Sequence, residues 1–266
     1  MNWLRPYTYF SIIILVLPVA LLVYEGFGPM YDSTGVSMGV LRSIELSFAG
    51  SATAGLVNVA LFTPLAYYVS RRRNELLATL SDIPASIPHP IVGISLLLLD
   101  SPLTPIGRAL LSVGINFFDT YLGFVSALTI ISAPIYVTAL RSYFDSMDRS
   151  AENFAVSLGA PPQRVFTDVV VPSSYGGIVN ALLTSISRAL SEFGSVAIVA
   201  YYVLQQPFYG VESASVKIYE LYGYSGPRVA VTASALMIGF SLILLLASRL
   251  IKRYAFRPVF VLGGPS

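Results

Sequence analysis

The chain has 266 residues, of which 55% are hydrophobic and 11% are charged, and its formal net charge is +2. A soluble domain carries roughly a quarter of its residues as charged side chains, so this composition predicts an integral membrane protein. The small net charge argues against a nucleic-acid partner, and the sequence has no cysteine for a disulfide or a thiolate metal site.

Six apolar segments predict six membrane-spanning helices, because roughly 20 apolar residues in a helix cross the hydrocarbon core of a bilayer. In chain order they are Tyr9–Tyr24, Ile44–Ser70, Ile83–Leu99, Tyr121–Leu140, Gly177–Tyr202 and Val229–Leu250. No small-x-small cleavage motif follows the first segment, so we expect a retained span and not a signal peptide. The expected fold class is an all-α, polytopic membrane protein in which residues 1–266 form a single transmembrane domain.

The third segment is interrupted by Pro84, Pro88 and Pro90, and the only histidine, His89, lies among them. Prolines leave backbone carbonyls without helical partners, which inside a membrane must be satisfied by neighbouring protein or water. We therefore expect this broken segment to face the bundle interior or a cavity. A histidine in such a place is typical of a hydrogen-bonded interior residue; the alternative is a donor that lines a cavity and meets an anion.

The arginines and lysines predict the orientation. Four of them fall on one side of the predicted spans: Arg42, Arg108, Lys217 and Arg228. Eleven fall on the other: Arg5, Arg71, Arg72, Arg73, Arg141, Arg149, Arg164, Arg249, Lys252, Arg253 and Arg257. Since positive residues are retained on the inner side, both termini of this multi-pass protein of the cell membrane are expected in the cytoplasm.

The most polar connection, residues 145–174, lies between the fourth and fifth spans and is expected in the cytoplasm. Phe154, Ala155 and Leu158 form an apolar stripe at helical spacing, and Gly159 with the two prolines after it ends one helix and begins a second. The loop is therefore predicted to be two short helices joined by a turn. The small Ala155 and Gly159 leave room for the close approach of a partner's surface.

This loop resembles the cytoplasmic signature loop of ABC-importer permeases, whose pattern is Glu-Ala-Ala, three residues, Gly, nine residues, Ile-x-Leu-Pro. Ala155 holds the third position, Gly159 follows at the family spacing, and Asn153 stands at the glutamate position. Phe154 replaces the middle alanine. The resemblance implies a coupling helix that sits in a groove of a separate ATPase subunit, with these contact residues: Glu152, Asn153, Ala155, Gly159, Val169 and Pro172.

The predicted fifth span contains the charged residues Arg188 and Glu192, four apart and so on one helix face. An ion inside the membrane is costly unless it is paired, which makes both residues functional candidates. They can form a structural ion pair, line a wet pathway, or do both. The candidate pathway residues are Ser187, Arg188, Ser191, Glu192 and Gly194, together with His89.

The run Arg188–Tyr202 resembles the Arg-x-x-Ser/Gly-Glu-Phe-Gly segment of the sulfate/molybdate/tungstate permease family, and Ser191 and Ala200–Tyr202 resemble its molybdate/tungstate branch. This resemblance implies a permease that imports an oxyanion, paired with a second copy of itself. It also implies two copies of an ABC ATPase, which bind ATP and Mg, and an extracytoplasmic substrate-binding protein.

The chain itself contains no Gly-x-x-x-x-Gly-Lys-Ser/Thr phosphate loop, and one histidine supports neither a catalytic set nor a metal site. We therefore expect a transport subunit without catalytic residues or a cofactor of its own. The alternatives are a sulfate or thiosulfate permease, an ion-coupled secondary transporter, and a membrane scaffold. A secondary transporter would need an internal repeat and a relay of buried acids, for which only Glu45 and Glu192 are candidates.

Overall fold

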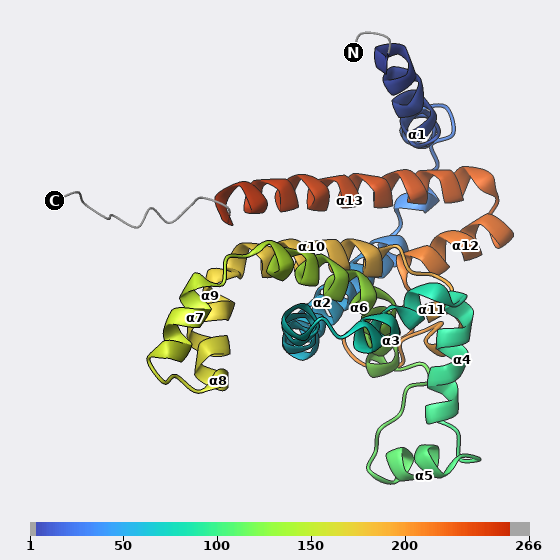
Figure 1. The fold of residues 1–266 in the computed structure, drawn as a ribbon. Coiled ribbons are helices and arrows are strands. Elements are labelled where there is room, and N and C mark those ends of the chain that lie inside the picture. Colours follow the sequence, from blue (N-terminus) through green and yellow to red (C-terminus); the bar gives the residue numbers. More distant parts are fainter. Residues whose placement is uncertain (1–3, 256–266) are drawn as a thin grey trace.

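The computed structural model describes residues 4–255, with side chains described as far as Leu250, so Arg257 lies outside the described residues. Within this part the regular structure is helical, apart from an isolated antiparallel bridge between Val203 and Val211, which confirms the all-α prediction (Figure 1). The helices are α1 (Leu4–Phe27), η1 (Ser33–Val36), α2 (Met38–Arg72), α3 (Glu75–Ser86), α4 (His89–Leu99), α5 (Pro105–Ser112), α6 (Tyr121–Ser146), α7 (Ser150–Ser157), α8 (Pro162–Arg164), the π-helical η2 (Val165–Val170), α9 (Val171–Ser173), α10 (Tyr175–Leu190), α11 (Val196–Val199), α12 (Ala214–Tyr224) and α13 (Pro227–Ala255).

Four of the described helices, α1, α2, α6 and α13, are long and apolar enough to cross a membrane. Two bent helix pairs raise the number to six if each pair is one span: α3 with α4, bent by 102°, and Pro162–Ser173 with α10, bent by 74°. On that count the upper number agrees with the six spans predicted from the sequence. The first of these bends follows Ser86, among the prolines of the third apolar segment.

The predicted fifth span, Gly177–Tyr202, is wrong as a continuous helix. The helix ends at Leu190, and only the four-residue α11 follows before an irregular connection to α12. The Glu192 carboxylate accepts hydrogen bonds from the backbone N–H and the hydroxyl of Ser195, both at 2.9 Å. Such local side-chain bonds offer the backbone an alternative to helical pairing, so the chain turns although its apolar character continues.

The centre of the bundle consists of α2, α6 and α10, which pack against one another. Three hydrogen bonds join α2 to α6 along their length: Thr53–Tyr121 at 2.9 Å, Asn58–Ser132 at 2.8 Å and Thr63–Tyr136 at 2.7 Å. Glycine lets α2 approach α10 closely, because a Cβ at Gly55 would lie 2.6 Å from the Ile186 side chain. These contacts make α2 and α6 one unit, with α10 fitted against it.

The first helix lies at the edge of the molecule and packs against α13 (Figure 1). Its attachment is concentrated at its carboxyl end, where a Cβ at Gly26 would lie 2.5 Å from the Ala235 side chain. Just beyond, the Asp32 N–H donates to the Thr232 hydroxyl at 3.0 Å. Most side chains in the rest of α1 are exposed, as expected for a helix that contacts lipid.

Candidate functional site

The connection between α6 and α10 forms two short helical legs, as the sequence predicts. The first leg is α7, and Gly159 ends it with a left-handed φ of +81°. The second leg runs through α8, η2 and α9, beginning at Pro162. Because glycine adopts positive φ without strain and proline suits the first helical turn, these residues fix the turn between the legs.

The predicted apolar stripe of this loop is divided between the surface and the core. Phe154 and Leu158 are 67% and 73% exposed, whereas Ala155 packs into the apolar cluster around Tyr136 and Phe144. Of the other predicted coupling residues, Asn153, Gly159 and Pro172 are exposed, Val169 is half-buried and Glu152 is buried. The loop thus presents three apolar side chains, those of Phe154, Val156 and Leu158, to its surroundings, while its single glutamate points inward.

Glu152 belongs to a cluster that we call the loop junction, formed by Tyr67, Arg71, Phe144 and Glu152. Arg71 Nε donates to Glu152 Oε2 at 3.1 Å and Arg71 Nη2 to Glu152 Oε1 at 2.5 Å, so the pair is bidentate. The Tyr67 hydroxyl also donates to Oε2, at 2.9 Å, and Arg71 Nη1 donates to the Phe144 carbonyl at 2.7 Å. The junction therefore joins α2, α6 and α7 through charge-assisted hydrogen bonds.

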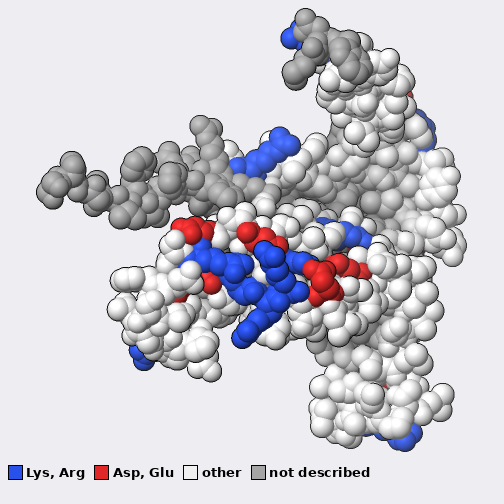
Figure 2. All heavy atoms as spheres, viewed as in Figure 1, with Lys and Arg blue, Asp and Glu red and all other residues white. Residues whose placement is uncertain are grey.

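Further polar contacts surround the loop junction. Ser70 donates to Asp145, and Arg141 lies 3.8 Å from Asp145 and 3.7 Å from the exposed Glu75. Figure 2 shows one face of the molecule on which acidic and basic side chains gather while most of the remaining surface is uncharged. Charged side chains are therefore concentrated around the loop junction on this face.

A second cluster, which we call the broken-span cluster, consists of His89, Arg188 and Glu192. It lies where the two broken spans meet, because α4 begins at His89 and α10 ends just after Arg188. Arg188 Nη2 is 2.8 Å from His89 Nε2 and 3.4 Å from Glu192 Oε2, and His89 Nδ1 is 3.1 Å from the same carboxylate oxygen. Arg188 Nη2 also lies 3.2 Å from His89 Nδ1; with a ring proton on Nδ1 the imidazole donates to Glu192 and accepts from Arg188 at Nε2.

The members of the broken-span cluster differ in exposure. The Glu192 side chain is fully buried and is fixed by the Ser195 hydrogen bonds, whereas Arg188 and His89 are 21% and 35% exposed. Arg188 Nη1 also reaches the Ser191 hydroxyl, at 3.2 Å. The cluster therefore holds its acid inside and leaves the Arg188 guanidinium partly exposed, an arrangement suited to brief contact with an anion.

Five of the six predicted pathway residues lie together in this region. A Cβ at Gly194 would lie 3.2 Å from the His89 Cβ, so the absence of a side chain there lets the two broken spans touch. Ser187, the sixth residue, faces elsewhere. The structure adds Ser195, which the sequence analysis missed although it follows Glu192 by three residues.

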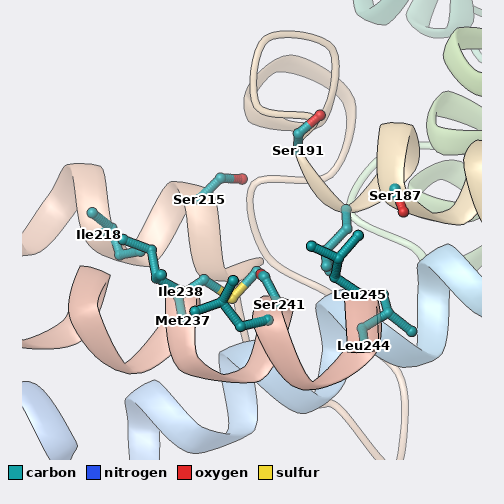
Figure 3. Close-up of a pocket in the computed structure, with 11 residues that line it drawn as sticks. Ser187, Ser191, Ser215, Ile218, Met237, Ile238, Ser241, Leu244 and Leu245 are labelled. Carbon is teal, nitrogen blue, oxygen red and sulfur yellow. The ribbon is translucent and has the colours of Figure 1, made fainter. Parts of the chain in front are cut away.

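Ser187 and Ser191 line a cavity of 480 Å³ between α10, α12 and α13 (Figure 3). Figure 3 shows Ser215 on its α12 side and Met237 and Leu245 on α13. The hydroxyls of Ser187, Ser191 and Ser215 donate to the backbone carbonyls of Leu183, Arg188 and Glu192. These hydroxyl protons are therefore not available to a ligand. Since the remaining lining is mostly apolar, the cavity suits an apolar group and not an anion.

Another ionic group lies on α12 and was not singled out from the sequence. Lys217 Nζ is 2.6 Å from Glu212 Oε1 and 3.1 Å from Glu220 Oε2. Burial lowers the pKa of Lys217, but hydrogen bonds to both glutamates outweigh burial and raise the pKa above its ordinary value. This lysine therefore stays charged and ties the start of α12 to the preceding loop. Among the described residues no group of three or more His, Cys, Asp or Glu could hold a metal ion.

Comparisons with known proteins identify relatives of the whole architecture. A family model described as "binding-protein-dependent transport system inner membrane component" matches residues 59–257. The chain is 29% identical to the molybdate/tungstate transport system permease protein WtpB of Thermococcus kodakarensis, over 76% of this chain and 75% of that protein. It is 28% identical to the sulfate transport system permease protein CysT of Synechocystis, over 93% of this chain and 87% of that protein.

A solved structure has a similar fold. It is a bacterial ABC transporter involved in the import of the acidic polysaccharide alginate, with a TM-score of 0.67 at 19% identity, over 95% of this chain and 96% of that one. At this level of identity the likeness concerns the fold alone.

Proposed function

Because the chain belongs to the family of binding-protein-dependent transport system inner membrane components, we propose that it is the permease through which an ABC importer carries an oxyanion. ATP and Mg bind to a separate ATPase subunit, present in two copies. A second copy of the permease completes the pore, and an extracytoplasmic protein delivers the anion. The chain lies in the cell membrane with both termini in the cytoplasm.

The broken-span cluster is the observation that supports this proposal most directly. Arg188 offers partly exposed nitrogen donors, while the buried Glu192 balances the arginine's charge at 3.4 Å. A full positive charge without this balance would hold a dianion too tightly for rapid release. The cluster therefore favours passage of an oxyanion over storage of one.

Molybdate or tungstate is the favoured cargo, because Ser191 and Ala200–Tyr202 resemble the molybdate/tungstate branch, to which WtpB belongs by name. Sulfate is the second candidate, since the similarity to CysT extends over more of the chain. All three are tetrahedral dianions that would meet the same nitrogen donors. Uptake of radiolabelled molybdate, tungstate and sulfate into proteoliposomes, with the cognate ATPase and binding protein, distinguishes them.

The exposed side chains Phe154 and Leu158 support the proposal that α7 docks into the ATPase. Large apolar side chains close together on a polar loop, here with the exposed Val156 between them, are typical of a protein contact, not of a free surface. We expect Phe154→Asp to abolish co-purification of the ATPase with the permease. Leu103→Asp is the matched control, because Leu103 is 88% exposed but lies outside this loop. Retention of the ATPase by Phe154→Asp contradicts this docking surface, and uptake driven by an ion gradient without ATP contradicts the proposed function.

A further inference from the structure

The glutamate of the coupling loop is directed away from any partner that approaches from water. Glu152 is the buried residue of α7, and the Glu152 and Arg71 side chains are only 9% and 11% exposed. All the hydrogen bonds that the carboxylate accepts come from Arg71 and Tyr67 of α2. Glu152 thus connects the loop to the bundle, while Phe154 and Leu158 remain free for the ATPase.

Arg71 is in turn held in place by contacts with α6 and with Tyr67, which itself packs against the second leg of the loop. Its Nη1 donates to the Phe144 carbonyl near the end of α6, and its guanidinium lies over the rings of Tyr67 and Phe144 at 5.3 and 5.9 Å. Tyr67 also contacts Phe166 of the second leg, with ring centroids 5.2 Å apart. A guanidinium enclosed in this way has little freedom to reorient when Glu152 moves.

The contacts beyond Arg71 continue to the broken-span cluster. Hydrogen bonds fix α2 to α6 at Thr53, Asn58 and Thr63, the last two of them buried, so we expect these helices to move as one body. Gly55 of α2 lies directly against Ile186 of α10, two residues before Arg188. Packed helices and hydrogen bonds therefore form a continuous route from α7 to the residue that faces the anion.

We propose that Arg71 and Glu152 form a strut that transmits movement of α7 to α2, and that Glu152 acts as a positioning residue and not as an ATPase contact. This inference rests on the proposed function, in which α7 docks into the ATPase. The ATPase holds the exposed apolar side of α7, and the strut converts its displacement into movement of the α2–α6 unit. Without the strut, ATP is still hydrolysed but less of the movement reaches the pathway.

The test uses the complete transporter, in proteoliposomes, with molybdate and tungstate as probes. Glu152→Gln keeps the shape of the side chain and removes the charge. We expect the amount of bound ATPase to stay at the wild-type level, while uptake per ATP hydrolysed falls at least about fivefold, the scale of an ordinary coupling free energy. Arg71→Gln should lower uptake per ATP equally, and the double variant no further, because the two residues act as a unit.

The chain offers a matched control in the pair Arg141–Glu75, whose charged atoms lie 3.7 Å apart. This pair joins α6 to α3 without touching α7, and Glu75 is 82% exposed. Arg141→Gln and Glu75→Gln should keep the wild-type ratio of uptake to ATP. The charge-removing variants of the strut can fail to fold, and in that case Tyr67→Phe replaces them, because it removes only one hydrogen bond. It should lower the ratio of uptake to ATP hydrolysed roughly twofold, the smallest effect expected of a residue that couples two sites.

A distance measurement distinguishes a strut that transmits movement of α7 from an ion pair that only stabilises the fold. The sequence has no cysteine, so Arg72→Cys and Ser157→Cys place spin labels at two exposed positions, at the end of α2 and on α7. With the strut intact, the distance between the labels should be the same in the nucleotide-free and ATP-bound transporter. In the Glu152→Gln background it should change between these states by more than the width of the wild-type distribution.

A wild-type ratio of uptake to ATP in Glu152→Gln overturns the strut. Loss of ATPase binding in that variant also overturns it, since Glu152 would then be a docking contact, and so does a constant label distance in the Glu152→Gln background. If the wild-type permease itself binds no ATPase, the proposed function fails instead, so the two failures are distinguishable.

Discussion

The loop junction and the broken-span cluster use the same pair of residue types, arginine and glutamate, in opposite ways. At the loop junction both side chains are nearly buried, and the carboxylate accepts two hydrogen bonds from the guanidinium and one from a tyrosine hydroxyl. At the broken-span cluster only the carboxylate is covered, while Arg188 and His89 remain partly exposed. This difference in exposure matches the two roles proposed above, a buried pair that transmits movement and a partly exposed arginine that contacts the anion.

The largest expected effect is loss of the enclosed pair. Arg71→Leu leaves the Glu152 carboxylate buried with one hydroxyl donor and should lower the free energy of unfolding by about 3–5 kcal/mol. Denaturant unfolding in detergent micelles measures this change. Arg72→Leu, at the exposed neighbouring position, should change little. If both variants lose the same free energy of unfolding, burial of the Arg71–Glu152 pair does not set its contribution to stability.

The next effect concerns the contact between the two broken spans. A Cβ at Gly93 would lie 2.6 Å from the Ser195 carbonyl oxygen, so Gly93→Ala forces α4 away from the segment that carries Glu192. We expect a loss of about 2 kcal/mol in unfolding free energy, as for other overpacked sites, together with reduced uptake. In Gly239→Ala the new methyl group meets no atom within 4 Å, so this variant should be neutral or slightly stabilising. A neutral Gly93→Ala contradicts the close packing of the spans.

A smaller effect is expected when the broken-span cluster keeps its positive charge but loses the planar guanidinium of Arg188. Arg188→Lys retains a cation, but one ammonium cannot serve His89, Ser191, Glu192 and an anion together. We expect uptake to fall about tenfold, equivalent to about 1.4 kcal/mol in the barrier, with ATPase binding unchanged. Arg164→Lys, at an exposed position of the second leg, serves as the control. Undiminished uptake by Arg188→Lys would remove the cluster from the pathway.

The smallest effect is expected for an ion pair in which both side chains are exposed to solvent, Arg141 partly and Glu75 largely. Arg141→Gln removes a contact of 3.7 Å to the largely exposed Glu75 and one of 3.8 Å to Asp145. Its cost in unfolding free energy should be below about 0.5 kcal/mol, the usual value for a surface pair. The same denaturant titration measures it, and a loss comparable with that of Arg71→Leu would contradict the distinction drawn from exposure.

The sequence was sufficient for features that depend on local patterns. Apolar runs located α1, α2, α6 and α13, the glycine and prolines after Leu158 located the turn of the loop, and the four-residue spacing of Arg188 and Glu192 indicated their pairing. Each of these follows from the geometry of one helix or one turn. The fold class and the membrane-spanning family could therefore be predicted before any tertiary contact was known.

The features that were missed depend on long-range contacts or on polar competition. His89 meets Arg188 across 99 residues, and Arg71 meets Glu152 across 81, so no local spacing could indicate either contact. The end of α10 at Leu190 was missed because residues 196–203 are as apolar as the helix before them. Hydrophobicity alone does not distinguish a helix that continues across the membrane from a chain that turns back.

The attachment of α1 at one end has a consequence for the lipid environment. Gly26 and Asp32 hold the carboxyl end of this helix against α13, while most of its other side chains are exposed. A helix anchored in this way can tilt about its attachment when the bilayer becomes thicker or thinner. We expect such a tilt to leave the packing of α2, α6 and α10 unchanged, so that α1 adapts the protein to membranes of different thickness.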